Sequence, residues 1–135
     1  MVGLFCIVLF ASAAILAPLI APYDPYAMNG SNLDAPSLTH LFGTDLLGRD
    51  IFSRVLYGAQ ISLFVGVGAV AIALVIGGAL GAIAGGFGGR VDSVIMRTTD
   101  VFLSIPSILL AIGIVTALGR GMVQLMFAIA VSYAP

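Results

Sequence analysis

The only histidine of this chain and four of its eleven charged residues lie in one short segment, HLFGTDLLGRDIFSR, residues 40–54. Two acid–base pairs occur there at a spacing of four residues, Asp45 with Arg49 and Asp50 with Arg54. Pairs in this order stabilise an isolated helix by about 0.2–0.5 kcal/mol each. We therefore expect an amphipathic helix over residues 43–58, capped by Thr44 or Asp45, with its charges in local ion pairs.

Catalytic chemistry has little support elsewhere in the chain. The sequence contains no HExxH, CxxC or GxxxxGK[ST] pattern, so it offers neither a familiar zinc site nor a phosphate-binding loop. Cys6 is the only cysteine, which excludes an intramolecular disulfide. We expect His40 to be a surface residue rather than a metal ligand, and we expect no catalytic residue, metal or cofactor in this chain.

The composition is that of a membrane protein. Of the 135 residues 61% are hydrophobic and only 8% are charged, and the mean hydropathy is +1.20. Soluble domains carry about 25% charged residues. The net charge of −1 gives no basic surface for nucleic acid and no polybasic segment for lipid. The predicted fold class is therefore all-α, a polytopic bundle of transmembrane helices in the lipid bilayer.

Long uncharged runs place the membrane-spanning helices, since a span needs about 20 apolar residues. We expect a first span over 1–20 and a second at about 61–84. Residues 21–58, rich in Pro, Asn, Ser and Asp, form a predicted extracytoplasmic loop that carries the amphipathic helix. Residues 59–135 are assigned to the main transmembrane domain.

Two further spans are expected in that domain, and both have distinctive features. The third, at about 101–118, contains Pro106, which acts either as a hinge or as a static bend. A fourth helix begins in 122–135, too few residues to cross the bilayer. We expect the sequence to be truncated there, and the lack of a basic leader suggests that Met1 is not the native start.

The second span carries a stripe of small residues that predicts close helix packing. Its members recur every four residues, which keeps them on nearly one helix face. Such a stripe lets a second helix approach closely; the alternative is the general enrichment of glycine in membrane helices. The stripe consists of Ala69, Ala73, Gly77, Gly81, Gly85 and Gly89.

Four segments in order resemble one protein family. They are APLIAPYDP at 17–25, FGTDLLGRDIFSR at 42–54, YGAQISL at 57–63 and TDVFLSIPSILLA at 99–111. The chain resembles the inner-membrane permease subunit of dipeptide, oligopeptide and nickel ABC importers. The motif residues are Gly43, Thr44, Asp45, Gly48, Arg49, Asp50 and Arg54.

The resemblance implies a six-helix permease of a bacterial or archaeal plasma membrane with a cytoplasmic N-terminus. It implies four kinds of partner besides lipid: a second homologous permease, two ATPase subunits that bind ATP and Mg²⁺, and an extracytoplasmic solute-binding protein. Transport would proceed by alternating access. The family's coupling loop of the EAA type is expected after Pro135, outside this sequence.

Two other functions remain open at this point. A membrane scaffold would use the small-residue stripe only to assemble partners. A secondary transporter would work alone, but such proteins use broken helices and ionisable residues at mid-membrane depth. The sequence is uncharged from Val55 to Gly89.

Overall fold

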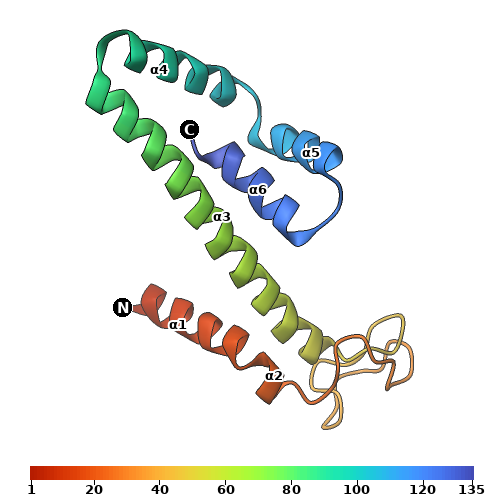
Figure 1. Cartoon of the computed structure of the whole chain (residues 1–135). Coiled ribbons are helices and arrows are strands. Elements are labelled where there is room, and N and C mark those ends of the chain that lie inside the picture. The colour runs from red at the N-terminus through yellow and green to blue at the C-terminus, as the bar shows by residue number, and fades with distance from the viewer. The chain divides into compact units, whose positions relative to one another are not determined.

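The computed structural model describes all 135 residues, and its regular elements are helices, which confirms the predicted all-α class. It divides into two compact units, Met1–Phe64 and Val65–Pro135, and helix α3 begins in the first and ends in the second. The helices are α1 (Val2–Ile15), α2 (Ala17–Ile20), α3 (Ile51–Phe87), α4 (Gly89–Ser104), α5 (Ser107–Leu118) and α6 (Met122–Tyr133) (Figure 1).

The predicted first span is two helices rather than one. Helix α1 ends at Ile15, and the short helix α2 follows after Leu16. Pro18 explains the interruption, because its nitrogen carries no hydrogen to donate to the carbonyl of Ala14. Helix α1 is apolar apart from Ser12, whose hydroxyl donates to the carbonyl of Leu9, and most of its side chains are exposed, as expected of a helix that contacts lipid.

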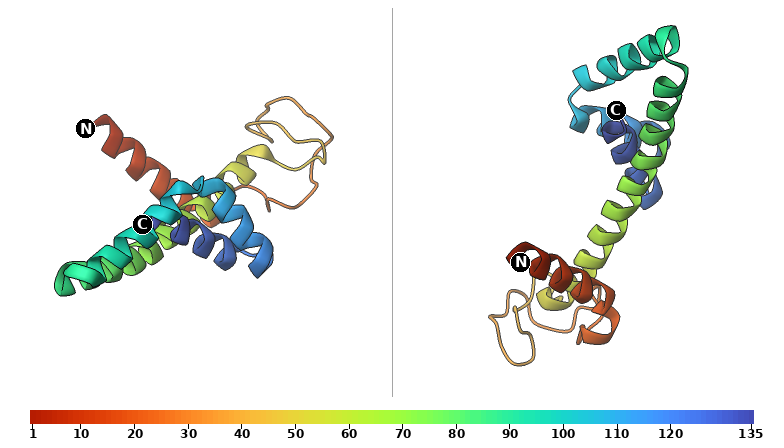
Figure 2. Two further views of the ribbon diagram at one scale, coloured as in Figure 1. Left: turned by 90° about the horizontal axis from the view of Figure 1, so that it is seen from above. Right: turned by 90° about the vertical axis from the view of Figure 1, so that its left-hand side faces the viewer.

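Residues 21–50 form a compact segment without helix, which we call the folded loop. The chain doubles back beside the start of α3 (Figure 2). Only two isolated β-bridges occur in it, Met28 with Arg49 and Thr44 with Asp50. The loop is therefore held mainly by hydrogen bonds between turns and side chains.

Helix α3 is the one helix that is long and apolar enough by itself to cross a membrane. Its 37 residues correspond to about 55 Å, whereas the hydrocarbon layer is about 30 Å thick. The helix begins at Ile51, so it includes the predicted span 61–84 and the second half of the predicted amphipathic helix. That amphipathic helix is not a separate element.

The predicted third span is broken at Pro106. Helices α4 and α5 meet there at an angle of 93°. Ile105 is extended (ψ 128°) because the proline ring disfavours helical backbone in the residue before it, and α5 restarts with Pro106 as its N-cap. The expectation of one helix over 101–118 was wrong, because residues 101–104 belong to α4. Whether Pro106 acts as a hinge stays a prediction.

In the second unit, helix α6 lies against α3 and α5 (Figure 1). A β-carbon at Gly77 would overlap the carbonyl oxygen of Ala134, so the backbones approach too closely there for any side chain. Gly81 and Gly85 have open space around them. Gly89 cannot belong to a stripe on α3, since that helix ends at Phe87.

Replacing Gly77 with valine should weaken the packing of α6 on α3. The obstacle is a backbone carbonyl, which cannot move aside as a flexible side chain can. We expect the free energy of unfolding in detergent to fall by about 1–3 kcal/mol. Gly78→Val is the matched control, because nothing lies within 4 Å of a β-carbon at Gly78. Equal losses in the two variants would rule out close packing at Gly77.

Candidate functional site: the folded loop before α3

Two glycines of the motif make turns that other residues could not make. Gly43 and Gly48 have positive φ angles of 73° and 71°. A β-carbon at Gly43 would overlap the carbonyl oxygen of Asp34, and one at Gly48 that of Gly30. Only glycine satisfies both conditions, since it alone adopts this backbone freely and has no side chain.

Asp45 organises the turn between these glycines. Its Oδ1 accepts hydrogen bonds from the backbone N–H groups of Leu47 (2.8 Å) and Arg49 (3.1 Å). Its Oδ2 accepts from Nε of Arg49 at 2.8 Å and also from the guanidinium of Arg54. One carboxylate thus closes a turn and joins it to the first turns of α3.

Asp50 caps helix α3 from a fully buried position. Its Oδ2 accepts a hydrogen bond from the backbone N–H of Ser53 at 2.7 Å, as an N-cap carboxylate does. Its Oδ1 lies 3.0 Å from Nδ1 of His40, which donates to it. The ring of His40 packs on that of Tyr23, with 5.0 Å between the ring centroids.

Further hydrogen bonds tie the two ends of the folded loop together. The hydroxyl of Ser53 accepts from the backbone N–H of Tyr23 at 3.2 Å, which joins the chain just after α2 to the first turn of α3. Thr44, 2% exposed, donates to the carbonyl of Ser31 at 2.6 Å and accepts from the N–H of Asp34 at 2.8 Å. Ser53 and Tyr23 could not be selected from the sequence, because they are 30 residues apart in the chain.

Two carboxyl groups of the folded loop have lowered pKa values. Burial raises the pKa of Asp45, but hydrogen bonds from the backbone of Arg49 and Leu47, and the Arg49 guanidinium, outweigh it and hold the pKa at about 2. Burial likewise raises the pKa of Asp50, and hydrogen bonds from Ser53 and from His40 lower it below its usual value. Both groups are therefore ionised at neutral pH.

The folded loop should lose stability in acid. A carboxyl whose folded pKa is lowered stabilises the fold fully above its usual pKa of 3.8 and loses this effect as the pH falls through the folded value. We expect amide exchange at Leu47 and Arg49 to accelerate, beyond its intrinsic pH dependence, as the pH falls from about 4 to about 2. Asp45→Asn should remove most of this dependence. A pH response that is identical in the variant would contradict the role given to Asp45.

The structure brings all seven motif residues into this loop and the start of α3, but with partners other than those expected. The pair Asp45–Arg49 forms, in a turn rather than a helix. Arg54 pairs with Asp45 instead of Asp50. The predicted cap at Thr44 or Asp45 was wrong, since α3 begins after Asp50. His40 is 7% exposed and is not the surface residue that we expected.

This arrangement is suited to holding a shape rather than to catalysis. The hydroxyl of Ser53 accepts from the backbone N–H of Tyr23, and Nδ1 of His40 donates to Asp50, so both side chains join separate parts of the loop. All buried polar side-chain atoms have hydrogen-bond partners. A cleft of about 310 Å³ borders the loop and is lined by Asp24, Tyr26, Arg54 and Tyr57, among others.

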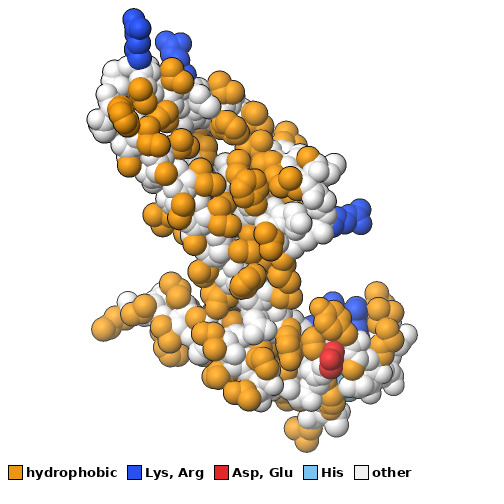
Figure 3. Space-filling view, in the orientation of Figure 1, with side chains coloured by type: hydrophobic (Ala, Val, Ile, Leu, Met, Phe, Trp, Pro, Cys, Tyr) orange, Lys and Arg blue, Asp and Glu red, His pale blue; other side chains and the backbone are white.

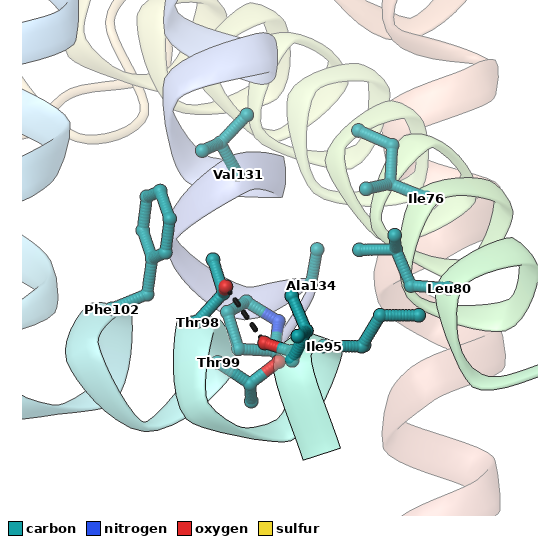
Figure 4. A pocket seen from close by; sticks show the side chains of 10 residues that line it. Ile76, Leu80, Ile95, Thr98, Thr99, Phe102, Val131 and Ala134 are labelled. Atoms are coloured by element: carbon teal, nitrogen blue, oxygen red, sulfur yellow. Dashed lines mark hydrogen bonds between the residues drawn. The ribbon is translucent and has the colours of Figure 1, made fainter. Parts of the chain in front are cut away.

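The second unit contains an apolar cavity of about 290 Å³ between α3, α4 and the end of α6 (Figure 4). Ile76 and Leu80 approach it from α3, and Phe102 from α4. Thr98 supplies a hydroxyl, but that hydroxyl already donates to the carbonyl of Val94 at 2.9 Å. No titratable side chain lines the cavity, so it offers no acid–base chemistry.

Comparison with known proteins identifies related permeases. Residues 1–38 match the family model described as the N-terminal TM domain of oligopeptide transport permease C. Residues 77–135 match the model of the binding-protein-dependent transport system inner membrane component. The folded loop's motif lies between these two matched regions.

Curated relatives align with nearly the whole chain. It is 46% identical over 130 residues to the probable D,D-dipeptide transport system permease protein DdpC of Escherichia coli, covering 96% of this chain and 44% of that protein. It is 48% identical over 135 residues to the dipeptide transport system permease protein DppC of Alkalihalophilus pseudofirmus, covering 99% and 44%. It is 44% identical over 133 residues to the oligopeptide transport system permease protein OppC of Bacillus subtilis, covering 98% and 44%.

The chain thus spans about half the length of the curated relatives that it matches. The two family models occur in order, and the relatives are 44–48% identical over both regions and the loop between them. The chain belongs to the family of binding-protein-dependent inner-membrane transport permeases.

Proposed function

We propose that this chain forms the N-terminal part of the permease subunit of an ATP-driven importer for dipeptides, oligopeptides or a related solute such as nickel. Family membership is the observation that carries the proposal. The chain itself is a transport subunit rather than an enzyme. It resides in a bacterial plasma membrane, where it would cross the bilayer several times.

The partners follow from the same proposal. A second homologous permease would complete the pathway, and two ATPase subunits would bind ATP and Mg²⁺ and drive alternating access. A solute-binding protein would deliver the solute on the extracytoplasmic side. The absence of charge from Val55 to Phe87 in α3 favours this division of labour over a secondary transporter, which needs ionisable groups within the membrane.

The folded loop has a specific role in this proposal. It ties the chain after α2 to the first turn of α3 through the bond from Tyr23 to Ser53, and through the buried pair His40–Asp50. A loop held in this way fixes the geometry between two membrane helices. We therefore assign the motif to the extracytoplasmic framework of the permease and not to the pathway itself.

Uptake measurements test the function. Cells with and without the intact gene that encodes these residues are given labelled dipeptide or labelled nickel. We expect uptake of one solute to require the gene, to stop when cellular ATP is depleted, and to persist when a protonophore is added while ATP is maintained. Loss with the protonophore alone would favour a secondary transporter. Unchanged uptake of both solutes in the deletion strain would remove the assignment and favour a scaffold.

A further inference from the structure

Helix α4 has an orientation that differs from that of an ordinary span. It starts at the end of α3, after a sharp turn in which Gly88 and Gly89 have positive φ angles of 59° and 56°. At its other end it meets α5 at 93°. Helix α5 is uncharged and apolar, so it suits the hydrocarbon layer. A helix perpendicular to one that lies along the membrane normal runs parallel to the membrane plane, which is the orientation that we infer for α4.

The apolar and the basic side chains of α4 lie on different faces, as an interfacial helix requires. Ile95 and Phe102 face the apolar cavity against α3 and α6 (Figure 4). Arg90 and Arg97 are seven residues apart, which places them within about 20° of each other around the helix axis. Both are exposed, and arginine side chains project from the surface over α4 (Figure 3).

Neither arginine has a protein partner. No carboxylate lies within 4 Å of Arg90 or Arg97, whereas Arg49 and Arg54 both pair with Asp45. Arg90 also lies in the first turn of α4, where the helix dipole disfavours a cation. Helix stability therefore does not explain its position.

Of the two acidic residues of α4, only Asp92 lies on a different side of the helix from the arginines. At 100° per residue, Asp92 is about 160° from Arg90 around the axis, and Asp100 is about 60° from Arg97. The net charge of the helix is zero, so attraction to anions depends on this arrangement and not on a polybasic composition. The cations share one exposed face, whose centre lies about 120° around the helix axis from the centre of the side that lines the cavity.

We propose that Arg90 and Arg97 bind the phosphate groups of anionic phospholipids and hold α4 in the headgroup layer. The positive guanidinium groups complement the negative lipid phosphates, because each guanidinium can donate two parallel hydrogen bonds to two phosphate oxygens. Exposed cations next to a membrane span also lie at the depth of the headgroups. Interfacial helices combine this attraction with a buried apolar face. The inference depends on α3 crossing the membrane, and it is independent of the solute that the importer carries.

Fluorescence quenching by brominated lipids measures this contact directly. The chain contains no tryptophan, so Val101→Trp, one turn after Arg97, adds a single indole beside the arginine face. The protein is reconstituted in phosphatidylcholine vesicles that contain brominated phosphatidylglycerol or brominated phosphatidylcholine. We expect brominated phosphatidylglycerol to quench this indole more strongly than brominated phosphatidylcholine does. The relative affinity of the site for the anionic lipid, calculated from the quenching, should fall about fivefold for each arginine replaced. High salt should reduce the preference.

Three variants separate the possible outcomes. The double replacement Arg90→Gln with Arg97→Gln should abolish the preference, and Arg90→Lys with Arg97→Lys should keep most of it. Arg120→Gln, in the turn between α5 and α6, is the control and should leave it unchanged. Circular dichroism verifies that each variant is helical. Equal quenching by the two lipids in the parent, or an unchanged preference in the double glutamine variant, would overturn the proposal. If the double glutamine variant lost transport although the parent showed no preference for anionic lipid, the proposal would be overturned and the arginines would instead bind an acidic protein partner.

Discussion

Gly43→Ala and Gly48→Ala are each expected to open the folded loop. Each replacement puts a side chain on backbone with φ above 70° and also drives a β-carbon into a backbone carbonyl. Strain of the first kind alone costs on the order of 1–3 kcal/mol. With the overlap added, we expect the opening free energy of the loop to fall by about 3 kcal/mol. Hydrogen exchange at the amides of Gly30 and Thr44 should then accelerate about 100-fold.

Gly58→Ala is the matched control for both variants. Gly58 lies in α3, and nothing is within 4 Å of a β-carbon built there. Alanine is also the better helix former, so this variant should leave the loop amides unchanged and slightly stabilise α3. Normal exchange protection in Gly43→Ala and Gly48→Ala would show that the motif glycines do not hold the loop in the described conformation.

Asp50→Ala should be nearly as damaging as the glycine replacements. The variant loses the N-cap of α3, which contributes about 1 kcal/mol, and leaves buried His40 without its charged acceptor, worth about 1.5–3 kcal/mol. We expect the stability of the loop to fall by about 2–4 kcal/mol. Amide exchange at Ser53 and the nitrogen chemical shift of His40 Nδ1 report the two losses separately.

Asp24→Ala controls for the loss of an aspartate. Asp24 is exposed, and its carboxylate accepts one local hydrogen bond, from the N–H of Tyr26 at 2.7 Å. Its removal should cost about 0.5–1 kcal/mol. If Asp24→Ala and Asp50→Ala destabilised the loop equally, the buried pair with His40 could not be its main support.

The sequence predicted the features that depend on local composition. Uncharged apolar runs located α1, α3 and α6, because the exclusion of charge from lipid acts on each segment separately. The resemblance to a permease family was confirmed, since its motifs are contiguous in the sequence.

The side-chain pairs that form when the loop folds back on itself could not be predicted from the sequence. Asp50 meets His40 ten residues away, and Arg54 reaches Asp45 nine residues away, because the loop folds back on itself. The helical spacing of four predicted the pair Asp50–Arg54 instead, and that pair does not form. A signal for the fold was present in Gly43 and Gly48, which flank Asp45, but spacing alone does not show that a glycine has positive φ.

Cysteine labelling across the membrane tests the central claim, that α3 separates the folded loop from α4 by crossing the bilayer. Three single-cysteine variants are made in a Cys6→Ser background. Leu38→Cys places the cysteine in the folded loop, Val70→Cys places it in the span of α3, and Ser93→Cys places it in α4. With a membrane-impermeant maleimide and intact cells, we predict labelling at position 38, none at position 70, and labelling at position 93 only after the membrane is permeabilised. Labelling of positions 38 and 93 from the same side, or of position 70 from water, would contradict the account.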